Sequence, residues 1–380
     1  MLGLSNSPRA ERSIVVVDVV PGGVGAAILS LTPDGSAHII ASHRSMVTLE
    51  VETPEHSIAA LGERMDAVLG ALRSARPTLP ISEVYCVIHS PWARSSMVSS
   101  KSEYTGPTEI DQHAITDTAR ASMKDARGID LKNLFEARAV RIWLNGYPVQ
   151  MPEGKQAQTL EIVSLLSDLD PELRSSIEVS VHHTFANAKV VFRSAIRTFL
   201  DALARIPSAD GSYLVVDMGV DATEIVSVRD SAIAGTRTVS EGLRTILARV
   251  APDRPVQESL STIRMLLRDA CEGEACNQIR EAIAKAEPEL VRIFGEVIGE
   301  LAAGERVANK LVLIAHEDLQ EWLEQFFTRI DFTQFTLTTL PFVTYAMSSA
   351  DSRVYAADAS HLDTALHFDA ALVNIDARSE

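Results

Sequence analysis

The stretch that decides the fold is residues 213–228, YLVVDMGVDATEIVSV. An apolar run ends at Asp217, a turn contains Gly219, and a second apolar run begins at Thr223. Two such runs around a short glycine-containing turn predict a β-hairpin. The bend either serves only the chain reversal or holds a phosphate. Glycine lets backbone N–H groups approach an anion closely, and a threonine hydroxyl adds a donor.

A similar pattern opens the chain. Residues 13–20, SIVVVDVV, predict a buried strand that contains Asp18 near its end. A glycine-rich turn and two further strands, at 24–32 and 37–42, complete a three-stranded meander. The hairpin at 213–228 also continues into a third strand, after which Gly242 begins a helix. Because a helix follows each meander, the sequence predicts a duplicated α/β unit.

Residues 90–185 have a different pattern. They predict a half-exposed strand, then a helix that Thr108 and Asp111 begin as a capping box and that runs to about residue 126. Two strands joined by an exposed arm follow, and Pro171 begins the next helix. This order predicts a small α+β unit inserted between two larger parts.

The length of 380 residues favours more than one core. We predict a first part at 1–89, the inserted unit at 90–185, and a second half at 186–380. The second half includes a helical region at about 252–305. Its tail predicts a helix near 341–350.

Charge and hydropathy exclude several classes of protein. The net charge is −16, so the surface repels nucleic acid and anionic lipid. The apolar run at 13–32 contains Asp18 and is broken by Pro21 and glycines. No other run approaches the ~20 apolar residues that crossing a bilayer needs. We therefore predict no signal peptide and no direct membrane insertion.

Cysteine usage is sparse. The sequence has 3 cysteines, and Cys271 and Cys276 are separated by four residues without a nearby histidine. This pattern predicts neither a metal site nor a disulfide framework. A reducing, cytoplasmic location is the natural expectation.

The two aspartate turns resemble the phosphate turns of the actin-like ATPases. Asp217, Gly219 and Thr223 stand where that family has D-x-G-x-x-x-T, and Asp18 stands at the first turn. The resemblance implies duplicated ribonuclease H-like domains of the α/β class. It also implies ATP with magnesium as cofactor, bound near Asp18, Asp217, Gly219, Thr223 and the helix that begins at Gly242.

The sequence departs from the family at several of these places. Val220 and Asp221 replace glycines, and Pro21 has no N–H to donate. Ala315 and His316, with Glu317 behind them, follow the strand at 310–315, where two glycines are usual. The departures favour a retained fold with an eroded nucleotide site. We predict no catalytic residue and a pseudo-ATPase, while an active phosphate turn remains the alternative.

The inserted unit narrows the resemblance to the FtsA/PilM branch, which comprises bacterial cell-division and type IV pilus assembly actin homologues. Residues 90–185 are similar to that branch's insertion in position, size and strand order. The tail has one arginine and the acidic residues Asp363, Asp369, Asp376 and Glu380. It therefore departs from the basic amphipathic helix with which FtsA-like proteins bind membrane.

A PilM-like role implies a cytoplasmic scaffold that binds a short peptide of an inner-membrane pilus or division protein. We expect the groove that receives this peptide around residues 84–105 and 140–160. Self-association of the scaffold is also possible on this resemblance. Trp143 and Tyr147 either cover a core edge or form a partner patch. The competing hypotheses are an FtsA-like cell-division ATPase and a sugar-kinase-like enzyme, which the insertion disfavours.

Overall fold

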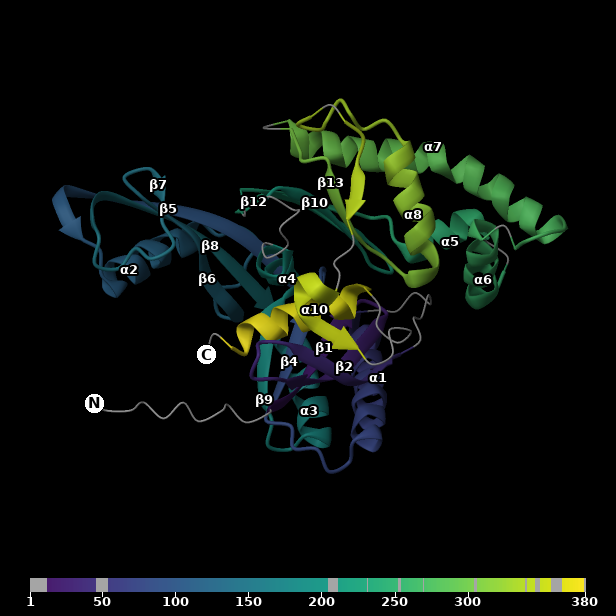
Figure 1. Ribbon diagram of the computed structural model, residues 1–380, viewed down its shortest axis with the longest axis horizontal. Helices are drawn as coiled ribbons and strands as arrows, with labels where there is room; N and C mark the ends of the chain where they lie inside the picture. Colours follow the sequence, from purple (N-terminus) through teal and green to yellow (C-terminus); the bar gives the residue numbers. More distant parts are fainter. Residues whose placement is uncertain are drawn as a thin grey trace.

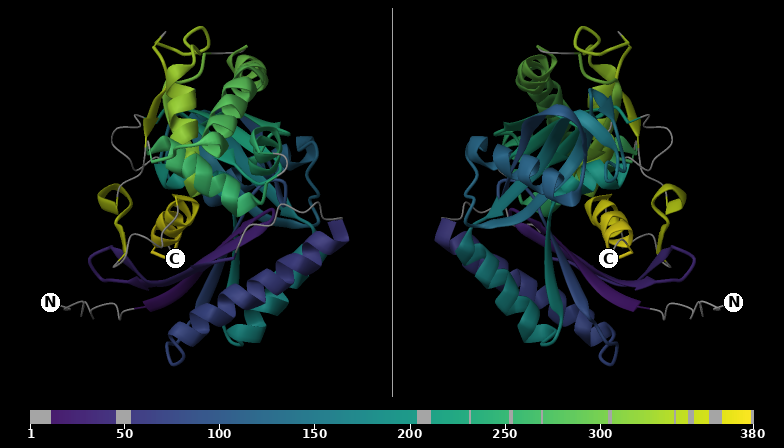
Figure 2. Two further views of the ribbon diagram at one scale, coloured as in Figure 1. Left: turned by 90° about the vertical axis from the view of Figure 1, so that its right-hand side faces the viewer. Right: turned by 90° about the vertical axis from the view of Figure 1, so that its left-hand side faces the viewer.

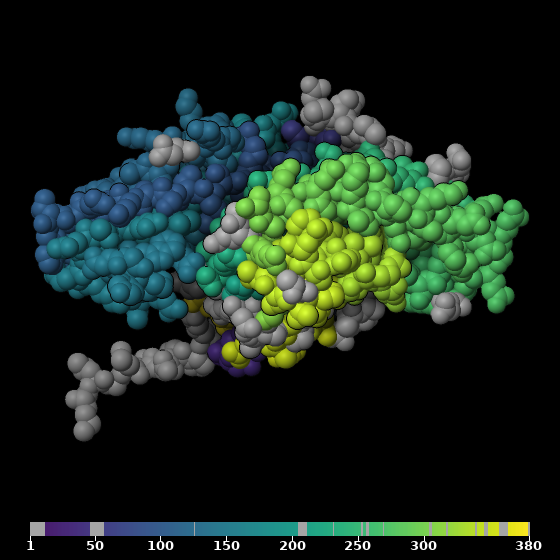
Figure 3. Space-filling model, turned by 90° about the horizontal axis from the view of Figure 1, so that it is seen from above, coloured from purple at the N-terminus to yellow at the C-terminus, as the bar shows by residue number. Residues whose placement is uncertain are grey.

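In the part of the chain that the structure describes, three β-sheets carry helices on their faces (Figure 1). The computed structural model describes residues 12–45, 54–203, 211–230, 232–251, 254–268, 270–303, 306–338, 340–345, 349–356 and 364–378. The inserted unit lies to one side of the second half of the chain (Figure 3).

The first sheet has 6 strands. In spatial order they are β15 (Val354–Ala356), β3 (Ala37–Arg44), β2 (Gly23–Leu31), β1 (Arg12–Val20), β4 (Glu83–Ile88) and β9 (Lys189–Ser194). The apolar residues of β1 alternate between two cores: Val16 faces one and Val17 faces the other. Burial on both faces explains its unbroken run of β-branched residues.

Helices cover both faces of this sheet. On one face α1 (Pro54–Ala75) packs beside α3 (Pro171–Thr184). On the other face α10 (Thr364–Asp376) packs on β1 and β2 beside α4 (Ala195–Asp201) (Figure 2). Asp170 caps α3 by accepting from Glu172 and Leu173, which confirms the helix start predicted at Pro171.

The second sheet has 5 strands and lies in the second half of the chain. In spatial order they are β12 (Ala232–Val239), β11 (Thr223–Arg229), β10 (Tyr213–Met218), β13 (Lys310–Ile314) and β14 (Val343–Tyr345). Its helices are α5 (Leu243–Val250), α6 (Val256–Leu267), α7 (Glu274–Ala302) and α8 (Glu317–Arg329), whereas the short α9 (Ser349–Ser352) packs against β15 of the first sheet. The predicted hairpin at 213–228 is β10 and β11.

The two sheets share the predicted duplication. In both, a three-stranded antiparallel meander pairs in parallel, through its first strand, with a later strand: β1 with β4, and β10 with β13. One apolar core joins the sheets, with Tyr85 of β4, Phe199 of α4 and Val215 of β10 among its members. The boundaries at residues 89 and 185 stay a prediction. Two strands of the predicted second half, β9 and β15, lie in the first sheet.

The inserted unit is a four-stranded sheet with one helix across it. Its strands, in spatial order, are β5 (Ala93–Glu109), β8 (Gln156–Leu169), β6 (Leu134–Leu144) and β7 (Tyr147–Pro148). The helix α2 (Gln112–Ser122) is followed by the 3-10 turn η1 (Met123–Asp125). The predicted capping box was wrong, because Thr108 belongs to β5. Asp111 is the cap instead and accepts from the N–H of Ala114.

The C-terminal region also corrects the sequence prediction. The helix predicted near 341–350 was wrong at residues 343–345, which form β14 and add a parallel strand to β13, whereas α9 at residues 349–352 overlaps the end of the predicted range. The unpredicted α10 is buried around Leu366, Phe368 and Leu372. Of the acidic residues in the tail, Asp369 and Asp376 are buried on α10, whereas Asp363 and Glu380 lie outside the described residues.

A second correction concerns the cysteines. Cys271, in the loop after α6, and Cys276, in the first turn of α7, form a disulfide with their Cα atoms 5.8 Å apart. Gly273, with a φ of 98°, lies inside this short loop and lets it turn back. A sparse cysteine count therefore did not exclude a pair, and the cysteines no longer argue for the reducing location expected from the sequence. Among the described helices, none combines the length and apolar character that crossing a bilayer requires.

The burial of α10 predicts a large role in stability. Phe368 is 2 % exposed in the core that joins the sheets. Phe368→Ala should lower the free energy of unfolding by about 3–5 kcal/mol, as truncation of a buried aromatic does. Tyr147→Ala, at a side chain that is 74 % exposed, should change it by less than about 0.5 kcal/mol. Urea denaturation measures both, and equal losses would contradict the core position of α10.

Candidate functional site

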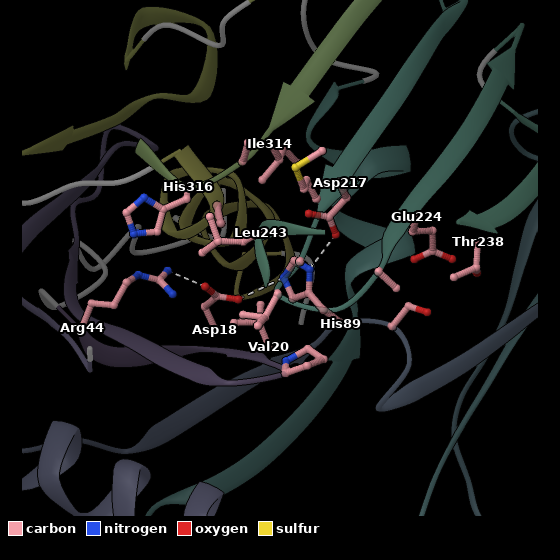
Figure 4. A pocket seen from close by; sticks show the side chains of 18 of the residues that line it. Asp18, Val20, Arg44, His89, Asp217, Glu224, Thr238, Leu243, Ile314 and His316 are labelled. Atoms are coloured by element: carbon pink, nitrogen blue, oxygen red, sulfur yellow. Dashed lines mark hydrogen bonds and ion pairs between the residues drawn. The ribbon is translucent and has the colours of Figure 1, made fainter. Parts of the chain in front are cut away.

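A cleft between the two sheets collects the charged residues of the candidate site (Figure 4). Its first wall is the β1–β2 hairpin, where Asp18 is fully buried. Asp18 pairs across the strands with Gly25, and Gly25 pairs with Arg44 of β3. The Arg44 guanidinium passes over Gly25 and forms an ion pair with Asp18. A Cβ at Gly25 would lie 2.5 Å from the guanidinium, so glycine keeps this path open.

His89 follows β4 and lies at the centre of the cleft. Its Nε2 is 3.0 Å from Asp18 Oδ1, and its Nδ1 is 2.8 Å from Asp217 Oδ2. The His89 N–H donates to the carbonyl of Val19, which holds its backbone beside β1. The side chain is 4 % exposed. A single buried imidazole therefore connects the aspartates of the two repeated units.

The charges at the site stabilise one another. Burial alone would lower the pKa of His89, but Asp217 and Asp18 raise it well above its usual value. Burial would likewise raise the pKa of Asp18, yet Arg44 and His89 hold it well below the usual range. Asp18 is thus an anion and His89 a cation at neutral pH.

A third carboxylate approaches from α10. Asp369 is 1 % exposed, and its Oδ2 lies 3.7 Å from His89 Nε2. Thr198 of α4 donates to its other oxygen at 3.3 Å. Burial raises the pKa of Asp369 to about 7, and nearby Asp18 adds to the rise against the lowering effect of His89. Burial therefore favours the protonated form of Asp369.

The second wall is the turn between β10 and β11. Asp217 and Gly219 line the cleft. The N–H of Gly219 donates to the carbonyl of Ala222 within the turn at 2.9 Å. Thr223 is fully buried, and its hydroxyl donates to the carbonyl of Glu241 at 2.6 Å. Two donors that the sequence assigned to phosphate are therefore used inside the protein.

Gly242 sets how closely α5 approaches this turn. The N–H groups of Leu243 and Arg244 at the start of α5 donate to the carbonyls of Gly219 and Val220. A Cβ on Gly242 would lie 2.6 Å from the Val220 oxygen, which is closer than atoms can pack. Gly242 does not line the cleft, so it acts by bracing the turn against the helix.

The remaining lining residues give the cavity a mixed character. Its volume is about 380 Å³, within the usual range for ligand pockets. Ala315 and His316 lie at the end of β13, as the sequence placed them, and the side chain of Glu317 lies outside the described residues. The carboxylate of Asp221 forms an ion pair with Arg244 at 2.7 Å. The negative charge expected to repel phosphate is thus partly neutralised.

Glu224 is a further acid in the cleft. It follows Thr223 on β11 and lines the cavity beyond Asp217. Burial, with repulsion from Asp217, raises the pKa of Glu224 to about 7, and His89 opposes the rise. Burial therefore favours the protonated form of this carboxyl.

Sequence reasoning found Asp18 and Asp217 but missed His89, Arg44 and Asp369. The one available signal for His89 was a polar residue directly after a buried strand, the same signal that identified Asp18. Arg44 lies 26 residues from Asp18, and Asp369 lies on the helix that the sequence did not reveal. These contacts depend on strand order and helix docking, which no local pattern encodes.

The bracing role of Gly242 can be tested by adding one methyl group. Gly242→Ala should lower the free energy of unfolding by about 1–3 kcal/mol, because the Cβ forces the turn away from α5. Gly70 on α1 is the matched control, since a Cβ there meets nothing within 4 Å. Gly70→Ala should stabilise the protein by about 0.5–1 kcal/mol, as it does in open helix positions. Chemical denaturation measures whether each variant lowers or raises the free energy of unfolding.

Glu224 predicts a pH effect on stability. Its folded pKa is above the unfolded value, so the folded state binds more protons between the two values. Stability is therefore lost as pH rises from about 4.5 to about 7, by about 1–3 kcal/mol. Glu224→Gln should be more stable than wild type at pH 8 and equal to it at pH 4. Exposed Glu63→Gln should show no such difference in urea melts at the two pH values.

Comparison with known proteins identifies the architecture. No protein-family profile and no curated protein match the sequence. A chain of the PilM-PilN type IV pilus biogenesis complex superposes with a TM-score of 0.63 at 12% identity, covering 97% of this chain and 100% of that chain. The ethanolamine utilization protein EutJ from Carboxydothermus hydrogenoformans covers 96% of this chain and 91% of that one, with a TM-score of 0.47 at 11% identity.

The likeness to the chain of the pilus complex extends over both repeated units and the insertion, because it covers 97% of the present chain. This agrees with the mixed α/β sheets and the duplicated meanders described above, and it confirms the predicted fold class. The chain therefore has the actin-like ATPase fold, in the form seen in the PilM-PilN complex.

Proposed function

We propose that this protein is a cytoplasmic, PilM-like scaffold that docks a peptide of an inner-membrane protein during type IV pilus assembly. The observation that carries the proposal is a cavity between two sheet edges. The strand β5 ends the sheet of the inserted unit, and β12 ends the second sheet. A cavity of about 300 Å³ separates them.

The lining of this cavity suits an extended chain. Ser95, Ser96 and Met97 come from β5, and residues 233–237 come from β12. Leu165 and Ile196 add apolar surface between them. An edge strand presents unpaired backbone groups, so a peptide can add as a further strand and place alternate side chains in the cavity. Of the groove expected around residues 84–105 and 140–160, the first range includes the β5 wall of this cavity, whereas the second range does not line it.

The nucleotide cleft supports a scaffold with a weak or lost ATP site. Asp18 and Asp217 are engaged by His89, and the Gly219 N–H and the Thr223 hydroxyl are engaged by backbone carbonyls. A triphosphate would have to displace these contacts and approach three acids. The donor set therefore fits Mg-ATP poorly, and we infer that partner binding is the retained function.

Partner capture tests the docking proposal. Ala234 of β12 is exposed on the cavity, so Ala234→Arg should fill the cavity and abolish recovery of the partner. Ala67→Arg on the exposed side of α1 is the matched control and should retain recovery. The measurement is pull-down from solubilised cell membranes with mass spectrometry. Wild-type protein that recovers neither a pilus nor a division protein would contradict the proposal.

Calorimetry tests the cleft. Titration of wild-type protein with Mg-ATP should give no binding heat up to millimolar nucleotide, because the donors of the second turn are already used. Binding that Asp217→Ala abolishes in folded protein would contradict this and favour the alternative, an FtsA-like cell-division ATPase. Circular dichroism of Asp217→Ala establishes that the variant is folded.

A further inference from the structure

The cleft holds an unusual concentration of buried acids. Asp18 comes from β1, Asp217 from β10 and Asp369 from α10, and each is at most 9 % exposed. Carboxylates buried together repel one another and lose hydration, so such a group needs a cation. Arg44 reaches Asp18 from the solvent side. Among the described residues, His89 is the cation that lies between Asp18 and Asp217 (Figure 4).

The geometry sets the charge of the His89 ring. A carboxylate accepts hydrogen bonds and cannot donate them, whereas a neutral imidazole has one N–H only. Both ring nitrogens of His89 lie within 3.0 Å of a carboxylate oxygen. The Nδ1 contact with Asp217 is a hydrogen bond, whereas the Nε2 contact with Asp18 is an ion pair without hydrogen-bond geometry. Two carboxylates this close to one buried ring favour its imidazolium form. The charge-assisted hydrogen bond from Nδ1 to Asp217 is about twice as strong as a neutral one.

We propose that His89 is a built-in cation that joins the two halves of the protein, so that a side chain and not a bound ligand sets the width of the cleft. The backbone of His89 is fixed to the first sheet by its bond to Val19. Asp217 belongs to the second sheet. The contact between Nδ1 and Asp217 therefore ties one sheet to the other at the base of the cleft.

Asp369 completes the bridge from the side of α10. Its Oδ2 approaches Nε2, which already contacts Asp18. Removing the imidazolium would leave three buried acids without their shared partner, with Arg44 remaining for Asp18 alone, and unpaired buried charges are strongly destabilising. The inference concerns the cleft alone and does not depend on the peptide partner proposed above.

A cavity variant with chemical rescue tests the role of charge. His89→Ala should lower Tm by roughly 5–15 °C, as loss of a buried ion pair does. Added imidazole can enter the vacated space as a cation and should restore most of the loss. Pyrazole has the same size but stays neutral at pH 7, so it should restore little. His183→Ala, at an exposed histidine of α3, controls for histidine removal and should retain wild-type Tm.

A distance measurement tests the closure of the cleft. Spin labels at Glu63→Cys on α1 and Glu321→Cys on α8 report on the first and second sheets. Both positions are exposed, Cys86 is buried, and the other cysteines form the disulfide. Electron–electron double resonance should give one narrow distance that millimolar Mg-ATP does not change. The His89→Ala background should broaden it, and imidazole should narrow it again.

Several results would overturn the inference. Equal rescue by pyrazole would mean that His89 only fills space. Failure of both compounds would mean that the lost stability does not come from the charge of the ring. A wild-type distance that changes with Mg-ATP would mean that a ligand sets the cleft. If His89→Ala does not fold, His89→Gln keeps the volume without the charge, and a wild-type Tm and distance in that variant would contradict the proposal. Partner capture measures neither Tm nor the spin-label distance. The docking proposal and the His89 proposal can therefore be refuted independently.

Discussion

The arrangement of the cleft depends on burying acidic groups from different parts of the chain against one imidazolium. Asp18 and Asp217 occupy equivalent ends of the two repeated meanders, and His89 lies between them. The ring stabilises both carboxylates and they stabilise its charge, while Arg44 gives Asp18 a second cationic partner. The same contacts connect the sheets and determine which atoms remain for a ligand. Stability and binding at the cleft are therefore coupled through one side chain.

The second turn shows how a phosphate-type pattern can serve the fold. The turn carbonyls accept the first N–H groups of α5, and Gly242 permits the close approach. The Thr223 hydroxyl is likewise used inside the protein. A sequence pattern with the right residues at the right spacing thus does not by itself show that its donors are free. Whether a turn can bind phosphate depends on whether its N–H and hydroxyl donors are already bonded to other groups of the protein.

The C-terminal helix and the inserted unit have different surroundings. In this structure α10 buries its apolar residues on β1 and β2, in the core that joins the sheets. The edges of β5 and β12, by contrast, leave backbone groups beside a cavity. A scaffold that meets a membrane machine through a peptide is consistent with both features.

The sequence by itself determined the strands of the two meanders, most helices, the inserted unit and two aspartates of the cleft. Those features follow from local periodicity, turn residues and apolar runs, and each is read within about twenty residues. Only the tertiary structure decided that Arg44 passes over Gly25, that His89 bridges the aspartates and that α10 brings Asp369 to them. The most distant of these pairs, His89 and Asp369, is separated by 280 positions in the sequence. They depend on how the sheets and helices pack, because no short segment specifies which distant charge will meet it.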